Sequence, residues 1–350
     1  MGMLGIDARA ARATWTVILV LLVCAIVYLI RRTLLIFVLS LLLAYLLLPV
    51  VDLIDRRLPF QRRRGLALAI VYVVLMGLLV AGAGSIGARV AEQAGALAKR
   101  VPDLIRQQHT LEIPLPEPLK PFAGRITEEV RGYIQSHSEE ILTGLSQVGV
   151  KVVGAAANLV FVVVVPILSF FFLKDGRAIQ AAVAGFFATS SHRDAVRDVL
   201  ADLNVLLVQY MRAIVLLGLA TFVCYTLFFV VAGVPYPVLL GAIAFPLEFI
   251  PMIGPLTASV IILLVAGFSG YPHLLWIVVF LIAFRLFQDY VLQPHLLSSG
   301  MELHPLAIMF GVFAGEQLAG IPGAFLSVPV LAALRIVYRR VVVPRFALAE

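Results

Sequence analysis

The sequence predicts an all-α polytopic membrane protein, and two observations lead to that fold class. First, 62% of the 350 residues are hydrophobic and 13% are charged, whereas soluble domains have about 45–50% and about 25%. Second, from Ala213 to Phe284 the only Asp, Glu, Lys or Arg is Glu248. A soluble domain of this size cannot bury so much apolar surface, so the bilayer must cover it.

Apolar runs long enough to span about 30 Å of hydrocarbon are expected to be membrane segments. We expect the stretch from Trp15 to be a retained anchor, because it runs into Ile30, Arg31 and Arg32 without a small-x-small cleavage site at that end. Only Arg31 and Arg32 separate the first two runs, so their joint is either a tight hairpin or a break in one long tilted element. The uncharged runs are 15–30, 33–51, 65–88, 152–173 and 213–232.

Arginine asymmetry predicts the orientation of the chain. Arginines precede the first run, crowd the loop "DLIDRRLPFQRRRG" and follow the last apolar run. The positive-inside rule places all three groups in the cytoplasm, with both termini inside and an even number of crossings. The formal net charge of +7 then fits attraction to anionic lipid, with no nucleic-acid partner expected.

This topology divides the chain into three parts. Residues 1–88 hold membrane segments 1–3. Residues 89–151 form an extracytoplasmic amphipathic helical insert, either a packing surface for neighbouring segments or subunits, or a cap that gates substrate. Residues 152–350 form the transport core, with membrane segments 4–8 and a cytoplasmic amphipathic helix at 174–212.

Two apolar segments are too long to be single straight spans. Residues 234–266 would make a helix of about 50 Å and residues 305–341 one of about 55 Å, and both carry Gly and Pro near the middle. Each is expected to be discontinuous, as a re-entrant hairpin or as a pair of bent half-helices. The breakers are Pro246, Pro251, Gly254 and Pro255 in the first segment, and Gly315, Gly320, Pro322 and Gly323 in the second.

A pair of Gly/Pro-interrupted segments indicates a transporter's binding site, because irregular backbone at membrane depth must line a cavity or be buried in protein. The alternative is that the prolines only kink packed helices. The first interpretation predicts a substrate or ion pathway lined by Glu248, Pro251, Gly254, Pro255, Glu316, Gln317, Gly320 and Pro322.

The few other intramembrane charges are expected to support this pathway. Arg285 and Asp289 are four apart and predict an intrahelical ion pair, with Gln288 beside them. Glu248 and Glu316 have no such local partner, so each is expected to line the pathway or to pair over a distance. Arg285 and Arg212 are the candidate partners of Glu248.

No motif in the chain predicts an enzyme, a cofactor or a metal site. The sequence has no G-x-x-x-x-G-K-[ST], H-E-x-x-H or G-x-S-x-G motif. The six histidines lack ligand spacing, and Cys24 and Cys224 both lie in apolar runs. A primary pump, an intramembrane hydrolase and a disulfide framework are therefore not expected.

Four stretches, in order, resemble the autoinducer-2 exporter family of PerM-like permeases. They are "FVVVVPILSFFFLKDG", "GVPYPVLLGAIAFPLEFIPMIGP", "FQDYVLQPHLL" and "LHPLAIMFGVFAGEQLAGIPGAFLSVPVLAALR". The family's E-x-I-P-x-I-G-P core maps onto Glu248 to Pro255, and its H-P pair onto His304 and Pro305. The sequence departs from the family where Ile214 replaces a glutamine and Glu316 replaces a small residue, so both positions are expected to affect substrate choice.

The resemblance implies about eight membrane segments, an extracytoplasmic insert after the third, a homo-oligomer and a place in the bacterial inner (cytoplasmic) membrane. It implies export of the quorum-sensing signal autoinducer-2 or, in some members, Na⁺(Li⁺)/H⁺ antiport. The sequence thus favours a secondary transporter or exporter of a small polar solute, coupled to protons or cations. The alternative of another class is a scaffolding membrane protein that organises partners through residues 89–151.

Overall fold

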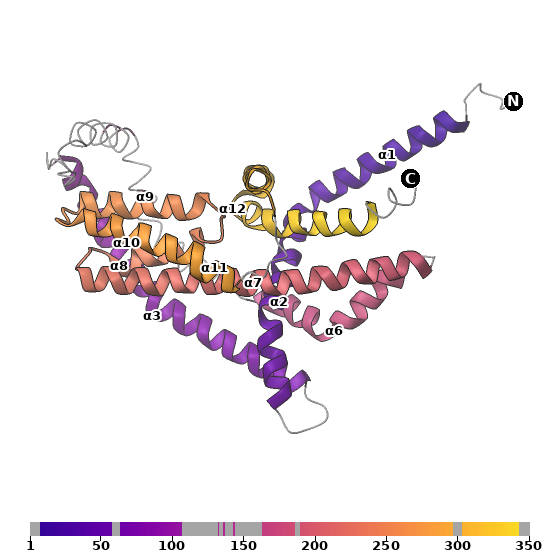
Figure 1. Cartoon of the computed structure of the whole chain (residues 1–350), viewed down its shortest axis with the longest axis horizontal. Coiled ribbons are helices and arrows are strands. Elements are labelled where there is room, and N and C mark those ends of the chain that lie inside the picture. The colour runs from indigo at the N-terminus through magenta and orange to yellow at the C-terminus, as the bar shows by residue number, and fades with distance from the viewer. Residues whose placement is uncertain are drawn as a thin grey trace.

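The expected all-α fold is confirmed. A computed structural model describes residues 8–57, 64–106, 132, 136, 143, 163–185, 190–296 and 303–342. Within these residues the ordered elements are helices and no strand occurs, and Figure 1 shows how they are arranged. Five helical stretches among them are long and apolar enough to cross a membrane: Arg31–Arg57, Arg64–Arg100, Asp194–Ala232, Leu274–Leu296 and Pro305–Arg340.

The first two helices meet at a bend. Helix α1 (Ala8–Leu29) and helix α2 (Arg31–Arg57) flank Ile30, whose amide bonds to the Ile26 carbonyl at 3.0 Å. The Ile30 carbonyl in turn accepts from the Leu34 amide at 2.9 Å, so helical bonding continues through the joint. The joint is thus a break in one long element, one of the two forms left open above, and the direction changes there in Figure 1.

Helix α3 (Arg64–Arg106) has 43 residues, which is about 65 Å of helix. The third membrane segment and the first helix of the insert are therefore one continuous helix. Val90, Ala94 and Leu97 are buried against Leu239 of a later helix, and the Gln93 side chain accepts a hydrogen bond from the Leu239 amide at 2.8 Å. Most of the remaining insert lies outside the described residues.

The charged segment 174–212 is divided between two helices. Helix α6 (Val165–Gly185) carries its first part, and helix α7 (Ser190–Ala232) carries the rest and runs without interruption into the fifth predicted span. Within the described part of this segment, no helix is confined to residues 174–212. Most of residues 152–164, which begin the fourth predicted span, lie outside the described residues.

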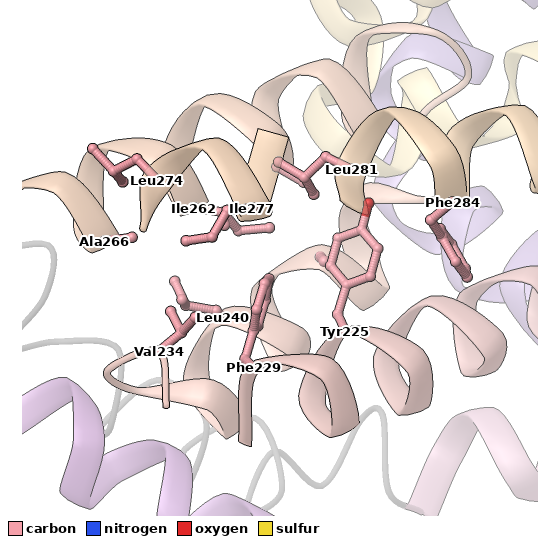
Figure 2. Close-up of a cluster of buried hydrophobic side chains, with 12 residues drawn as sticks. Tyr225, Phe229, Val234, Leu240, Ile262, Ala266, Leu274, Ile277, Leu281 and Phe284 are labelled. Carbon is pink, nitrogen blue, oxygen red and sulfur yellow. The ribbon is translucent and has the colours of Figure 1, made fainter. Parts of the chain in front are cut away.

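The first broken segment is a helical hairpin. Helix α8 (Pro237–Leu247) and helix α9 (Ile253–Phe268) are joined by turns at residues 248–252. A hydrogen bond of 2.9 Å from the Tyr271 hydroxyl to the Ala232 carbonyl brings the end of α9 back to the end of α7. Apolar side chains of α7, α8, α9 and helix α10 (Leu274–Phe287) fill the space between them (Figure 2).

A wide turn follows α10. Residues Gln288–Leu292 form a π-helix, η3, and α11 (Gln293–Leu296) continues from it. The Gln293 amide bonds to the Gln288 carbonyl, five residues back. Pro294 explains the widening, because proline lacks the amide of an α-helical bond and clashes with the preceding turn.

The second broken segment, α12 (Pro305–Val337), also folds back on itself before the π-helix η4 (Tyr338–Val342). Ala319 and Gly320 have non-helical dihedral angles, with φ of 63° at Gly320. Beyond this bend the two arms touch: a Cβ added to Gly323 would overlap the Gly315 carbonyl. A Cβ added to Gly311 would lie 3.4 Å from that of Ser327. Figure 1 accordingly shows α12 as two arms and not as one rod.

The glycine contact between the arms of α12 predicts the effect of two alanine substitutions. Gly323→Ala should lower the free energy of unfolding by about 1–3 kcal/mol or more, because the new methyl meets backbone that cannot move aside. Gly77→Ala, in α3 with no atom of the described residues within 4 Å of the added Cβ, should gain up to about 1 kcal/mol from helix propensity. Thermal unfolding of the purified proteins in detergent measures both, and equal stability of the two variants would contradict the close approach.

Candidate functional site

Helix α7 contacts both hairpins, the α8–α9 pair and the two arms of α12, at successive positions along its length. From its N-terminal half to its C-terminal end, α7 contacts first η4, then the second arm of α12, then the end of α8 and the break that follows it, and finally the base of that hairpin. The contacts are Asp202 with Arg340, Tyr210 with Phe325, Gly218 with Phe245, Thr221 with Glu248, and Ala232 with Tyr271.

The two hairpins therefore approach from opposite ends of α7 and meet partway along it. Phe249, in the first break, packs edge-on against Phe325 with ring centroids 5.5 Å apart. Phe325 lies on the arm that follows Gly320. The first break thus contacts the second arm of α12, and this contact forms the centre of the candidate site.

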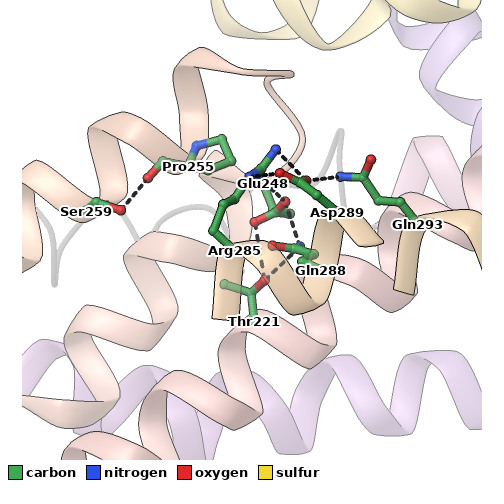
Figure 3. A network of polar contacts seen from close by, with 8 residues as sticks. All are labelled: Thr221, Glu248, Pro255, Ser259, Arg285, Gln288, Asp289 and Gln293. Carbon is green, nitrogen blue, oxygen red and sulfur yellow. Dashed lines mark hydrogen bonds and ion pairs between the residues drawn. The ribbon is translucent and has the colours of Figure 1, made fainter. Parts of the chain in front are cut away.

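Glu248 ends α8 and points between α7 and η3 (Figure 3). Its carboxylate accepts hydrogen bonds from the Gln288 side-chain amide at 2.8 Å and from the Thr221 hydroxyl at 3.2 Å. The side chain is 7% exposed, and both donors are buried. This buried carboxylate is therefore held by two neutral donors.

The only positive charge beside Glu248 in the described residues, Arg285, is shared with a second carboxylate. Arg285 forms the predicted intrahelical pair with Asp289, through Nε–Oδ2 and Nη2–Oδ1 contacts of 2.9 Å each. Its Nη1 atom is 3.7 Å from Glu248 Oε1, which is longer than a charge-assisted hydrogen bond. Gln293 donates to Asp289 at 3.0 Å and extends the network.

The cluster carries one unbalanced negative charge when its groups are ionised, because Glu248 and Asp289 face the single guanidinium of Arg285. An uncompensated charge inside a membrane protein is costly. One proton or one monovalent cation at Glu248 would balance it. No group of three His, Cys, Asp or Glu suited to a metal ion occurs in the part of the chain that the structure describes.

The chain around the first break explains why Glu248 lies there. A Cβ on Gly254 would overlap the Leu247 carbonyl oxygen, so only glycine allows α9 to begin so close to the end of α8. Met252 has a φ of 65°, an uncommon value for a non-glycine residue. Pro251 lies within the break, and Gly254 and Pro255 form the first turn of α9.

The structure brings together some of the predicted site residues and leaves others apart. Glu248, Arg285, Gln288 and Asp289 form one network, as Figure 3 shows. The remaining candidates take no part in that network: Arg212 is exposed on α7, Glu316 and Gln317 are exposed before the bend of α12, Gly320 makes the bend, and Pro322 follows it.

Two members of the network were not predicted from the sequence. Thr221 lies within an apolar span, and Gln293 lies near the end of the α10–η3–α11 element. A polar residue inside a membrane span is a weak signal by itself. Only the packing of α7 against α8 shows that the Thr221 hydroxyl reaches Glu248.

Broken helical hairpins that meet beside a buried carboxylate are typical of an all-α membrane transport protein. The comparison with known sequences agrees, because residues 17–342 match the model of the AI-2E family transporters. The chain belongs to this family, and its role is membrane transport.

Two relatives illustrate the similarity. "Putative transport protein YueF" of Bacillus subtilis is 24% identical over 308 residues, covering 84% of this chain and 80% of that protein. "Putative transport protein MT0215" of Mycobacterium tuberculosis is 30% identical over 300 residues, covering 84% of this chain and 79% of that protein.

Two threonines of α7 provide a matched test of the Glu248 contacts. Thr221→Val removes a donor to the buried carboxylate, so it should lower the free energy of unfolding by about 1–3 kcal/mol. The buried hydroxyl of Thr226 has no hydrogen-bond partner among the described residues, so Thr226→Val should be neutral or stabilising. Thermal unfolding in detergent compares them; a Thr221→Val protein as stable as the Thr226→Val protein would remove Thr221 from the site.

Proposed function

We propose that the protein is a secondary transporter that exports a small polar solute, such as an autoinducer-2-like signal, coupled to protons or a monovalent cation. The observation that carries the proposal is the buried Glu248 carboxylate, which shares one guanidinium with Asp289 and lies where the two hairpins meet. Secondary transporters bind substrate and coupling ion near the bilayer midplane, at discontinuous helices of this kind.

The local backbone suits a cation. Glu248 is the C-cap residue of α8, at the end where a helix is partially negative. Unwound carbonyls and helix C-termini coordinate Na⁺ or H⁺ in other transporter folds. The proposed pathway runs from this cluster past the first break, at Pro251, Gly254 and Pro255, to the exposed Glu316 and Gln317 and the bend at Gly320 and Pro322.

The same charge also suits Na⁺(Li⁺)/H⁺ antiport, in which the cation is itself the transported solute. A cation that binds Glu248 while a proton leaves would satisfy the charge balance without any second solute. A scaffolding protein has no use for an unbalanced buried charge and should tolerate its neutralisation. Flux measurements distinguish these functions.

Glu248→Gln keeps the shape of the side chain and removes its charge. In liposomes loaded with autoinducer-2, with Na⁺ or Li⁺ and an imposed pH gradient, the variant should lose gradient-driven flux while its expression and oligomer size stay normal. Glu92→Gln, an exposed position on α3, serves as the control and should transport like the unmodified protein. Normal coupled flux in a stable Glu248→Gln protein would disprove the proposal, and cation exchange without autoinducer-2 flux would favour antiport.

We further propose that the protein is a homo-oligomer in the bacterial inner membrane, with both termini in the cytoplasm. The start of α1 and the end of α12 lie at the same end of the molecule in Figure 1, which is compatible with termini on one side. The apolar side chains of α1, such as Trp15 at 67% and Leu21 at 63%, are exposed within one chain. Lipid or a second copy must cover them.

Cysteine labelling tests the orientation. In a variant without Cys24 and Cys224, a membrane-impermeant reagent applied to intact cells should label a cysteine at position 107 in the insert. The same reagent should not reach a cysteine at position 61, in the arginine-rich loop that the positive-inside rule holds in the cytoplasm. The opposite pattern would reverse the topology.

A further inference from the structure

Arg285 divides its interactions unequally between two carboxylates. Two of its nitrogens lie 2.9 Å from the two oxygens of Asp289, the bidentate geometry of a strong guanidinium–carboxylate pair. Only one nitrogen approaches Glu248, at 3.7 Å. Gln293 holds Asp289 in place from the next turn through a 3.0 Å hydrogen bond. The nearest positive charge therefore pairs closely with Asp289 and only loosely with the buried carboxylate of Glu248.

We infer that Asp289 is a positioning residue that keeps Glu248 available to a coupling proton or monovalent cation by holding Arg285 on itself. The inference rests on the proposed function of Glu248 and adds a determinant that does not contact the bound ion. Arg285 competes with the coupling ion for the Glu248 carboxylate. A guanidinium that pairs fully with Glu248 would supply the positive charge that the ion would otherwise bring. By pairing with Arg285, Asp289 leaves Glu248 to bind the coupling proton or cation and not the guanidinium.

Charge counting gives the consequence of each substitution. The ionised cluster of Glu248, Asp289 and Arg285 has a net charge of −1 and takes up one positive charge. In Asp289→Asn the net charge is zero, and Arg285 needs to move its Nη1 atom by only about 1 Å to form a charge-assisted hydrogen bond with Glu248. In the double variant Asp289→Asn/Arg285→Gln the net charge returns to −1 and Glu248 again requires an ion.

Few other groups can interfere with this balance. The charged and titratable side chains that face Glu248 are Arg285 from α10, Asp289 from η3 and Tyr225 from α7, within the described residues. Thr221 and Gln288 are neutral in every variant. Within the described residues, neither α9 nor α12 places a charged side chain in contact with the Glu248 carboxylate.

The experiment measures the melting temperature of the full-length protein in detergent, because ion binding to the folded state stabilises it without any known solute. One arm titrates NaCl against choline chloride at fixed pH, and the other changes pH without Na⁺, so that the arms separate a cation from a proton. Five proteins are compared: the unmodified chain, Glu248→Gln, Asp289→Asn, Asp289→Asn/Arg285→Gln, and Asp202→Asn. The last is a control, since Asp202 pairs with Arg340 outside the cluster.

The unmodified protein and Asp202→Asn should be stabilised by the ion in one of the two arms, and Glu248→Gln should not. Asp289→Asn should bind the ion at least about tenfold more weakly, although Glu248 is intact, and the double variant should recover the response. If Asp289→Asn does not fold, the double variant is used in its place. The double variant lacks Asp289, so it can be stabilised by the ion only if Asp289 is not itself a ligand of that ion.

Two other results separate the possible failures. An unmodified protein that responds no more than Glu248→Gln would overturn the proposed function and this inference together. A response that is lost in Glu248→Gln but fully retained in Asp289→Asn would leave the function of Glu248 standing and overturn the role of Asp289. A folded double variant without any response would also overturn it, because Asp289 would then bind the ion directly.

Discussion

A helix that breaks inside a bilayer releases backbone groups that have no water to bond, and the architecture depends on how this chain meets that constraint. Both breaks occur at the turns of helical hairpins, where the flanking arms cover each other. Glycines at the crossings, such as Gly254 and Gly323, let backbone pack on backbone. Helix α7 is unbroken and packs along both hairpins, so it joins them into one structure.

The sequence predicted this architecture to the level of segments. Chain length against bilayer thickness was enough to show that residues 234–266 and 305–341 could not be single spans. It did not show that both are hairpins, because charge bias is the same for a hairpin and for a bent pair. That choice depends on tertiary contacts, such as the bond from Tyr271 to Ala232 and the contact of Gly315 with Gly323.

The charged residues of the candidate site were predicted from the sequence, because charges are rare in an apolar chain. The neutral residues that only the tertiary packing brings to the site were missed. Glu248, Arg285 and Asp289 stand out in an apolar sequence, and the structure joins them. Glu316 stood out equally, yet it lies exposed on the first arm of α12 in the described conformation. Thr221 could not be recognised, because a threonine inside a span resembles any other until a carboxylate from another helix is placed beside it.

The hydrogen bond between Gln93 and the first turn of α8 links two distant parts of the molecule. Helix α3 continues into the predicted insert, where it carries Gln93. The side chain of Gln93 accepts a hydrogen bond at the base of the hairpin whose tip bears Glu248. The base of the hairpin is therefore attached to a residue of the predicted insert. Since α8 is about 16 Å long, a tilt of about 10° at the base would move the tip by about 3 Å, more than a hydrogen bond from Thr221 or Gln288 can follow.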